Sequence, residues 1–156
     1  MPGKVITMAI SLLRRLVFCL GIVAATGCVA APDCQYFNTT FGIGAWDAEM
    51  PRSLKLYEYE AGSGFGKPLG EPIEYTGSLS KGRGGKVYLS ISPTNFDRSG
   101  LDLGKDYKLV VDGSLEYRIS NVVSSGRGNL GCPIASATVN SCRVGAGPWI
   151  QFDKSC

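Results

Sequence analysis

The residues that could do chemistry in this chain are thirteen carboxylic acids and six cysteines, because the sequence contains no histidine. Without histidine there is no Ser-His-Asp or Cys-His nucleophilic site, no histidine-based zinc site and no general base of the usual neutral-pH type. Two carboxylates across a cleft could still hydrolyse a glycoside. No pair of acids is singled out by its spacing, so we predict no catalytic residues. A hydrolase that uses carboxylates alone is the weakest alternative.

The first 27 residues have the composition of a secretory signal. A basic segment ending in Arg14 and Arg15 is followed by an apolar run, Leu16–Ala25, and then by small residues. These three parts in this order define a signal peptide, and the run is shorter than the roughly 20 apolar residues of a membrane-spanning helix. We therefore expect residues 1–27 to be removed. Met8 offers a second start for the same signal.

The end of the signal resembles the lipobox of bacterial lipoproteins, in the stretch Ala25-Thr26-Gly27-Cys28, with Ala25 in place of the usual Leu. In that family the cysteine thiol is alkylated by diacylglycerol and the cysteine becomes the acylated N-terminus. The resemblance therefore implies that Cys28 carries a lipid anchor. In this family an Asp directly after the lipidated cysteine tends to retain the lipoprotein at the inner membrane, so Val29 at that position implies the outer membrane. Cleavage after Ala30 is the alternative, and it would release a soluble secreted or periplasmic protein.

Cleavage by either route leaves four cysteines: Cys34, Cys132, Cys142 and Cys156. Thiols of exported proteins pair, and the spacing lacks Cys-x-x-Cys, so we expect two disulfides rather than a metal or another cofactor. Strand patterns cover 134–140 and 149–154, and a wide hairpin turn between them would place Cys132 opposite Cys156. Cys142, in that turn, would then reach Cys34. A Cys132–Cys142 pair stays open, and Trp149 is expected in the core.

The charge balance removes one class of partner. The three charges of the signal are all basic, so 16 − 3 = 13 basic residues face 13 acidic ones in the mature chain. A chain without net positive charge lacks the main attraction to nucleic acid, and none is expected as a partner. Residues 28–34 then form the lipid anchor and a short tether, and residues 35–156 are long enough for one domain.

Alternation of apolar and polar residues predicts strands through most of this domain. Leu54 and Leu56 face one way, against Tyr57 and Tyr59, and Asp112-Gly113 is a tight-turn dipeptide between two alternating runs. One face of those runs holds Tyr107, Leu109 and Val111, followed by Leu115, Tyr117, Ile119 and Val123. About seven to eight strands at this spacing indicate a single antiparallel β-sandwich, immunoglobulin-like or transthyretin-like, with a small β-barrel as the alternative.

Two features are candidates for binding. The loop "KGRGGK" fails as a phosphate loop, because a strand rather than a helix follows it, so Lys81, Arg83 and Lys86 form either a solvated basic loop or a contact for an acidic partner. Tyr57 and Tyr59 lie on the polar side of their strand and form either an interface or a second half of the core. As an interface, they are predicted to share one exposed patch with the basic loop. The stretch "GSGFGKPLG" is interpreted as a turn.

These observations favour a non-enzymatic protein of the cell envelope. We expect a lipoprotein on the periplasmic face of the outer membrane, bound to the membrane through Cys28, that binds an envelope protein partner or serves it as an accessory module. Its tether would raise the local concentration of the domain without adding contacts. The second hypothesis is a soluble secreted binding module or inhibitor.

Overall fold

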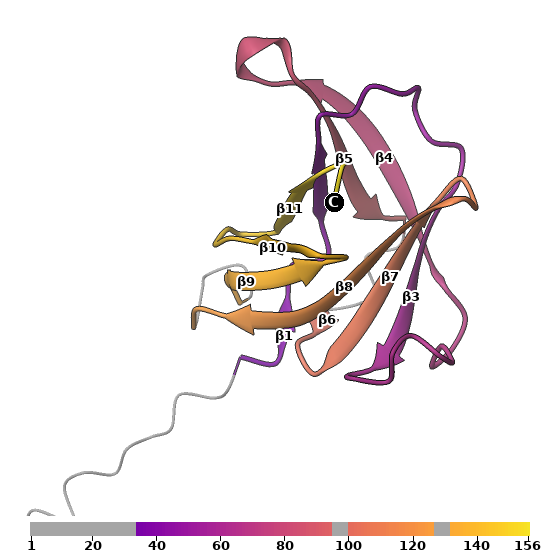
Figure 1. Ribbon diagram of the computed structural model, residues 1–156, viewed down its shortest axis with the longest axis vertical. Helices are drawn as coiled ribbons and strands as arrows, with labels where there is room; N and C mark the ends of the chain where they lie inside the picture. Colours follow the sequence, from indigo (N-terminus) through magenta and orange to yellow (C-terminus); the bar gives the residue numbers. More distant parts are fainter. Residues whose placement is uncertain (1–33, 95–99, 127–131) are drawn as a thin grey trace, which may run out of the picture. The chain divides into compact units, whose positions relative to one another are not determined.

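The computed structural model describes residues 34–94, 100–126 and 132–156 (Figure 1). Its elements all lie in the compact unit formed by residues 34–156. The expected signal, Cys28 and residues 29–33 lie outside the described residues. Within the described ranges, no helix has the length and apolar character that crossing a membrane requires.

The all-β prediction is confirmed: in the described ranges nine strands form one sheet and two short strands form another (Figure 1). The order in the large sheet is β10-β9-β8-β7-β3-β4-β5-β2-β11. These strands are β2 (Phe41–Gly44), β3 (Leu54–Glu60), β4 (Ile73–Lys81), β5 (Val87–Pro93), β7 (Lys105–Val111), β8 (Leu115–Ser124), β9 (Ile134–Val139), β10 (Cys142–Val144) and β11 (Ile150–Asp153). The small sheet pairs β1 (Tyr36–Phe37) with β6 (Leu101–Asp102).

The large sheet curls so that β10 and β11, at the two ends of the strand order, come close to each other. Neighbouring strands pair antiparallel except β11 and β2, which are parallel. The result is a nearly closed barrel whose two halves face each other across the core, so both the sandwich and the barrel descriptions apply to it.

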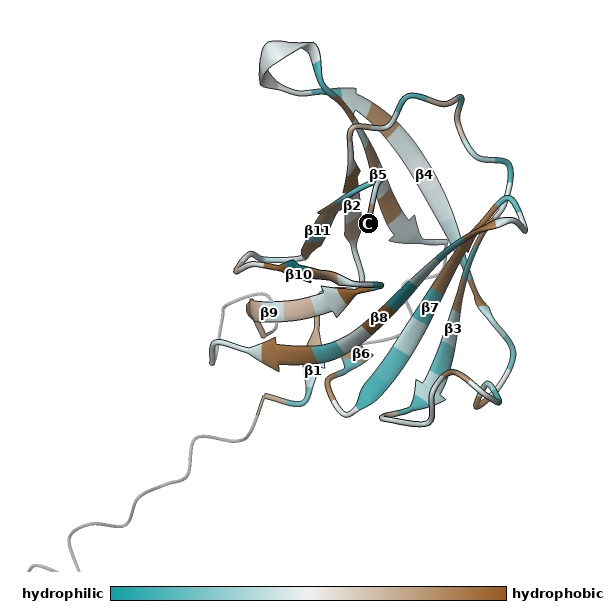
Figure 2. Ribbon diagram, in the orientation of Figure 1, coloured by the Kyte–Doolittle hydropathy of each residue, from teal (hydrophilic) through white to brown (hydrophobic). Residues whose placement is uncertain are grey.

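The core is built from the alternating residues. Leu56, Tyr107 and Leu109 are fully buried, and hydrophobic and hydrophilic residues alternate along β3 and β8 in Figure 2. The Tyr107 hydroxyl donates to the Asp102 carbonyl (2.8 Å), which satisfies its one polar group in the core. The Asp112-Gly113 turn is confirmed, because both residues adopt positive φ angles, 50° and 71°, as a tight hairpin of this kind requires.

The alternation predicted for β8 fails at its end. Val123, expected on the buried face, is 51 % exposed. The β8–β9 register shifts between Ser120 and Val123, and Asn121 adopts a φ of 51°. This bulge adds a residue to one strand and reverses which side chains point inward, so that Val122 packs against the core instead.

The disulfide pairing proposed above is wrong. Cys34 pairs with Cys132, and Cys142 pairs with Cys156, with Cα atoms 5.7 and 5.6 Å apart. The wide hairpin does not form, because β9 turns at Asn140 (φ 51°) and pairs with β10 instead.

The strand that follows this turn also pairs differently from the prediction. β11 lies parallel to β2, and among the residues that the structure describes no β9–β11 hairpin brings Cys132 opposite Cys156. Trp149, expected in the core, is 41 % exposed, while Trp46 is buried.

Candidate functional site

The outer face of β3, β7 and β8 carries a row of long polar and aromatic side chains. Tyr57 on β3 lies opposite Lys108 on β7, which in turn lies opposite Arg118 on β8. The Lys108 ammonium lies 5.7 Å from the centre of the Tyr57 ring and 6.0 Å from that of Tyr59. Cations placed over aromatic faces at this distance are attracted to the ring, so Lys108 makes cation–π contacts with both tyrosines.

The connection between β3 and β4, residues 61–72, folds over this face. The Gly62 amide donates to the carboxylate of Asp106 (2.9 Å), a buried acid on β7 beside Tyr59. Phe65 then packs edge-on against Tyr59, with ring centres 5.3 Å apart. The buried Asp106 therefore fixes the start of the connection, and the connection covers Tyr59.

Phe65 has an unusual backbone conformation, with a φ of 61°. An aromatic residue in the left-handed region is a strained outlier, and such strain is found mostly where a side chain is held in place for function. The ring is half-buried and the Arg118 guanidinium lies 5.7 Å from its centre. The loop thus holds an aromatic ring beneath the guanidinium of Arg118, a residue of β8, at the protein surface.

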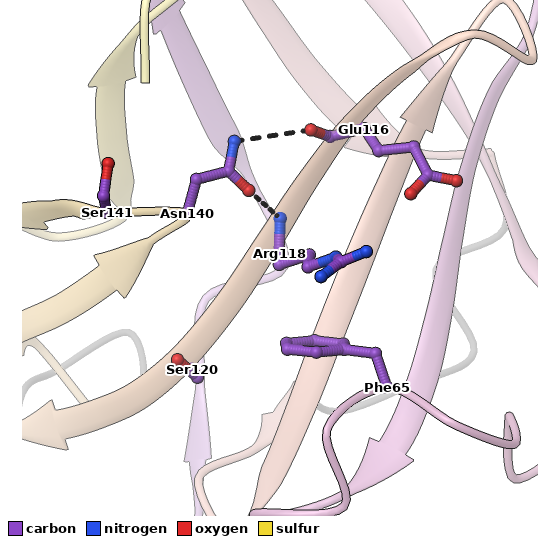
Figure 3. A pocket seen from close by; sticks show the side chains of 6 residues that line it. All are labelled: Phe65, Glu116, Arg118, Ser120, Asn140 and Ser141. Carbon is purple, nitrogen blue, oxygen red and sulfur yellow. Dashed lines mark hydrogen bonds between the residues drawn. The ribbon is translucent and has the colours of Figure 1, made fainter.

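These two side chains line an open groove of about 580 Å³ (Figure 3). Its lining residues come from the β3–β4 connection, from β8 and from the β9–β10 turn: Phe65, Glu116, Arg118, Ser120, Asn140 and Ser141. A second groove, of about 350 Å³, is also lined by Phe65 and Ser120, and Asp106 is another of its lining residues. Phe65 therefore stands between two grooves that together follow β8.

The polar side chains around the groove differ in how many hydrogen bonds and ion pairs they already make within the protein. The side chain of Asn140 accepts from the Arg118 amide (2.9 Å) and donates to the carbonyls of Glu116 (3.4 Å) and Cys156 (2.8 Å). Asn140 is therefore structural. Glu116 pairs with Lys108 (3.2 Å). Arg118 is exposed and makes no ion pair within the described residues, so its charge is available to a ligand.

Lys108 stays charged in this setting. Burial lowers its pKa, but the hydrogen bond that Lys108 donates to Glu116, the nearby Tyr59 and the Glu116 charge outweigh burial and raise the pKa overall. The groove is thus lined by the unpaired Arg118 beside an aromatic ring, and by Glu116, whose carboxylate is paired with Lys108. Aromatic rings and arginine dominate the energetic centres of protein interfaces, and this pairing suits an acidic or polar segment with an apolar neighbour.

The single exposed patch predicted for the tyrosines and the basic loop is wrong. Tyr59 is only 3 % exposed because Phe65 covers it, while Tyr57 is half-buried. Lys81 and Lys86 are exposed at the tip of the β4–β5 hairpin, around the short 3₁₀ turn Arg83–Gly85. Figure 1 shows this tip at the opposite end of the sheet from the end of β3.

The separation follows from the register of the strands. Ile73, where β4 begins, lies opposite Leu56 of β3, and Lys81 comes eight residues later. At 3.3 Å per residue this is a path of roughly 26 Å. The two candidate features are therefore separate surfaces.

Phe65, Lys108 and Arg118 were not predicted as site residues. The glycine-rich "GSGFGKPLG" was correctly interpreted as a turn. The signal that could have indicated a site was the Phe between its glycines, since a lone Phe in such a loop either packs against the domain or is exposed for binding. In the described part of the chain, no group of three or more Asp, Glu, Cys or His side chains comes together as a metal site would need. Comparison with protein-family models, with curated proteins and with solved structures found no match for this chain.

Proposed function

We propose that this protein is a lipid-anchored, non-catalytic binding module of the bacterial cell envelope, which holds a protein partner through the groove around Phe65 and Arg118. The observation that carries the proposal is the strained Phe65, held by a loop against an unpaired guanidinium. The Phe65 ring also covers Tyr59, but a preformed aromatic contact at the surface has a second use, because it lowers the entropy that binding costs.

The anchor rests on the lipobox-like sequence at Cys28. From Cys28 to Cys34 there are six residue steps, which span at most about 20 Å. Cys34 is tied to Cys132 by a disulfide, so the domain begins directly after this tether. A domain held so near a membrane would meet envelope partners at a raised effective concentration.

The anchor is tested by intact mass spectrometry of the protein from membrane and soluble fractions. We expect a chain that begins at Cys28 with a lipid-sized mass increment, in the membrane fraction. A soluble chain that begins at Ala31 would overturn the anchor and favour the secreted binding module.

The groove is tested by a photo-crosslinking amino acid introduced at Ser141, which lines it. We expect one discrete adduct in cells, lost when Arg118→Glu is added. The control is the same amino acid at Glu49, an exposed residue outside the groove, which should give no adduct of that mass. An adduct that persists in Arg118→Glu, or none at Ser141, would contradict the proposed contact.

A further inference from the structure

A second surface, on the β4–β5 hairpin, has the properties of a strand acceptor. The Gly82 amide donates to the Lys86 carbonyl (2.8 Å) and closes the hairpin. In an antiparallel pair, successive residues turn their backbone groups alternately toward the partner strand and away from it. Counting back from Gly82, the backbone groups of Lys81, Leu79 and Gly77 point away from β5.

An independent hydrogen bond supports this assignment. The Thr94 amide donates to the Glu74 carbonyl (3.0 Å), so Glu74 belongs to the series that faces β5, together with Thr76, Ser78 and Ser80. The outer edge of β4 is therefore formed by Gly77, Leu79 and Lys81, with three amides and three carbonyls.

β3 does not cover this edge. It pairs with β4 only from Ile73 to Tyr75, and just before β3 the Arg52 and Ser53 amides donate to the Asp112 carboxylate (2.7 and 2.9 Å) rather than to β4. Within the described ranges, no backbone hydrogen bond reaches the outer edge of β4. Proteins normally cover or shorten such edges, since an open edge pairs readily with another strand.

The chemistry around the edge indicates what would pair with it. Between Tyr75 and Phe96 the sequence carries three basic residues and no acid. Lys81 and Lys86 are exposed, and no ion pair of theirs is found in the described part of the chain. Leu79, two residues before Lys81, is 40 % exposed. Met50 is 42 % exposed, and its sulfur lies 3.3 Å from the position that a Cβ on Gly77 would take. Most of β4 is pale in Figure 2, between hydrophilic and hydrophobic.

We propose that the outer edge of β4 accepts an extended acidic segment of a protein partner as an added β-strand. The backbone groups of Gly77, Leu79 and Lys81 supply the hydrogen bonds, the basic tip selects acidic side chains, and Leu79 with Met50 takes the apolar ones between them. This surface is separate from the groove around Phe65, so it adds a second contact to the proposed function and does not depend on it.

The test is an NMR titration of the isotope-labelled protein with a capped peptide of alternating Glu and Val. We expect the amide signals of Gly77, Leu79 and Lys81 to shift and their hydrogen exchange to slow, while Thr76, Ser78 and Ser80 are protected from the start. Two further peptides carry N-methyl groups on all Val or on all Glu residues. Only one of them should lose binding, because alternate residues of an added strand face the edge.

Leu79→Pro is the decisive variant, because it removes an amide that faces outward and leaves the β4–β5 ladder intact. We expect binding at least about tenfold weaker than in the matched control Leu79→Val, which keeps the amide. Unchanged signals of Ser78 and Ser80 would verify that the hairpin of Leu79→Pro still forms.

Several outcomes would overturn the proposal. The first is that no amide signal shifts with up to ~1 mM peptide, a concentration at which weak binding is still measurable. The second is that a peptide of alternating Lys and Val binds equally well. The third is that both methylated peptides bind equally well. Slow exchange at Gly77, Leu79 and Lys81 in a dimer without peptide would assign the edge to a second copy of the chain. None of these results would alter the crosslink from Ser141, so this inference and the proposed function fail separately.

Discussion

Cys142 and Cys156 are joined by a disulfide that links the two edge strands of the large sheet. Cys142 begins β10, and Cys156 follows β11 at the other end of the strand order. Beside this bond, the Asn140 side chain donates to the Cys156 carbonyl (2.8 Å), and the Tyr117 hydroxyl donates to that of Lys154 (3.2 Å). The barrel is therefore closed by side chains and a covalent bond where a ladder of backbone hydrogen bonds would close a regular barrel.

The two disulfides should contribute unequally to stability. Cys34 and Cys132 are 98 residues apart and Cys142 and Cys156 only 14, so on the chain-entropy model their loss costs about 5 and about 3 kcal/mol. We expect the double Ser variant of Cys34 and Cys132 to unfold at lower guanidinium concentration than that of Cys142 and Cys156. Peptide mapping without reductant checks the pairing first, and the reverse order of midpoints would contradict the expectation.

Asn140 should be needed for both its conformation and its side chain. Asn140→Gly keeps the left-handed φ of 51° but loses three side-chain hydrogen bonds, and we expect a loss of about 1–2 kcal/mol. Asn140→Ala should lose roughly 1 kcal/mol more, because it adds backbone strain. Denaturant unfolding measures both, with Ser141→Ala as the neighbouring control. Equal losses for Gly and Ala would argue against the strain.

The sequence was sufficient to predict those parts of the structure that depend on interactions between residues near each other in the chain. Alternation correctly assigned Leu54, Leu56 and Leu109 to the core, and Asp112-Gly113 to a turn, because both depend on neighbours in the same strand or hairpin. These signals fixed the fold class and most strands of the barrel.

The errors arose where the backbone conformation of a single residue changes which side chains face the core or which strands pair. Asn121 inserts a bulge that exposes Val123, and Asn140 makes a tight turn that changes the strand partners and, with them, the disulfides. Asn accepts positive φ but does not require it, so neither position was distinguishable from its neighbours. The groove was also beyond prediction, since Phe65 and Arg118 meet only after the β3–β4 connection folds over the sheet.

The buried tyrosines should make the protein sensitive to alkali. Burial raises the pKa of Tyr117 to about 12, and burial with the nearby Glu58 and Asp102 charges raises that of Tyr107. An unfolded tyrosine titrates near pH ~10, so the unfolded state loses its protons first. The stability that these neutral tyrosines contribute is complete below pH 10 and is lost as the pH rises toward 12 and above.

The thermal midpoint measured across that range tests this expectation. We expect it to fall from pH ~10 upward, and to fall less steeply in Tyr117→Phe, which has one titrating group fewer. Tyr117→Phe should also have a lower midpoint at neutral pH, because it loses the hydrogen bond to the Lys154 carbonyl. Tyr36→Phe, at an exposed tyrosine, is the control. A slope unchanged by Tyr117→Phe would count against the burial of this hydroxyl.

Phe65 should matter for binding far more than for stability. Phe65→Gly loses the contact with Tyr59 but relieves the strain of a φ of 61°, which is worth about 1–2 kcal/mol in a residue with a Cβ. These effects oppose each other, so the free energy of unfolding should change by less than about 1 kcal/mol. The photo-crosslink from Ser141 should nevertheless disappear, because the ring that faces Arg118 is gone.

The matched control for Phe65 is Leu69→Ala, which removes an exposed apolar side chain from the same connection outside the groove. We expect this variant to keep both its stability and the crosslink. If Phe65→Gly keeps the crosslink and loses several kcal/mol of stability, Phe65 serves to cover Tyr59 and Asp106, and the strain is a cost of packing. If it keeps its stability and loses the crosslink, the loop holds Phe65 in that conformation for the partner.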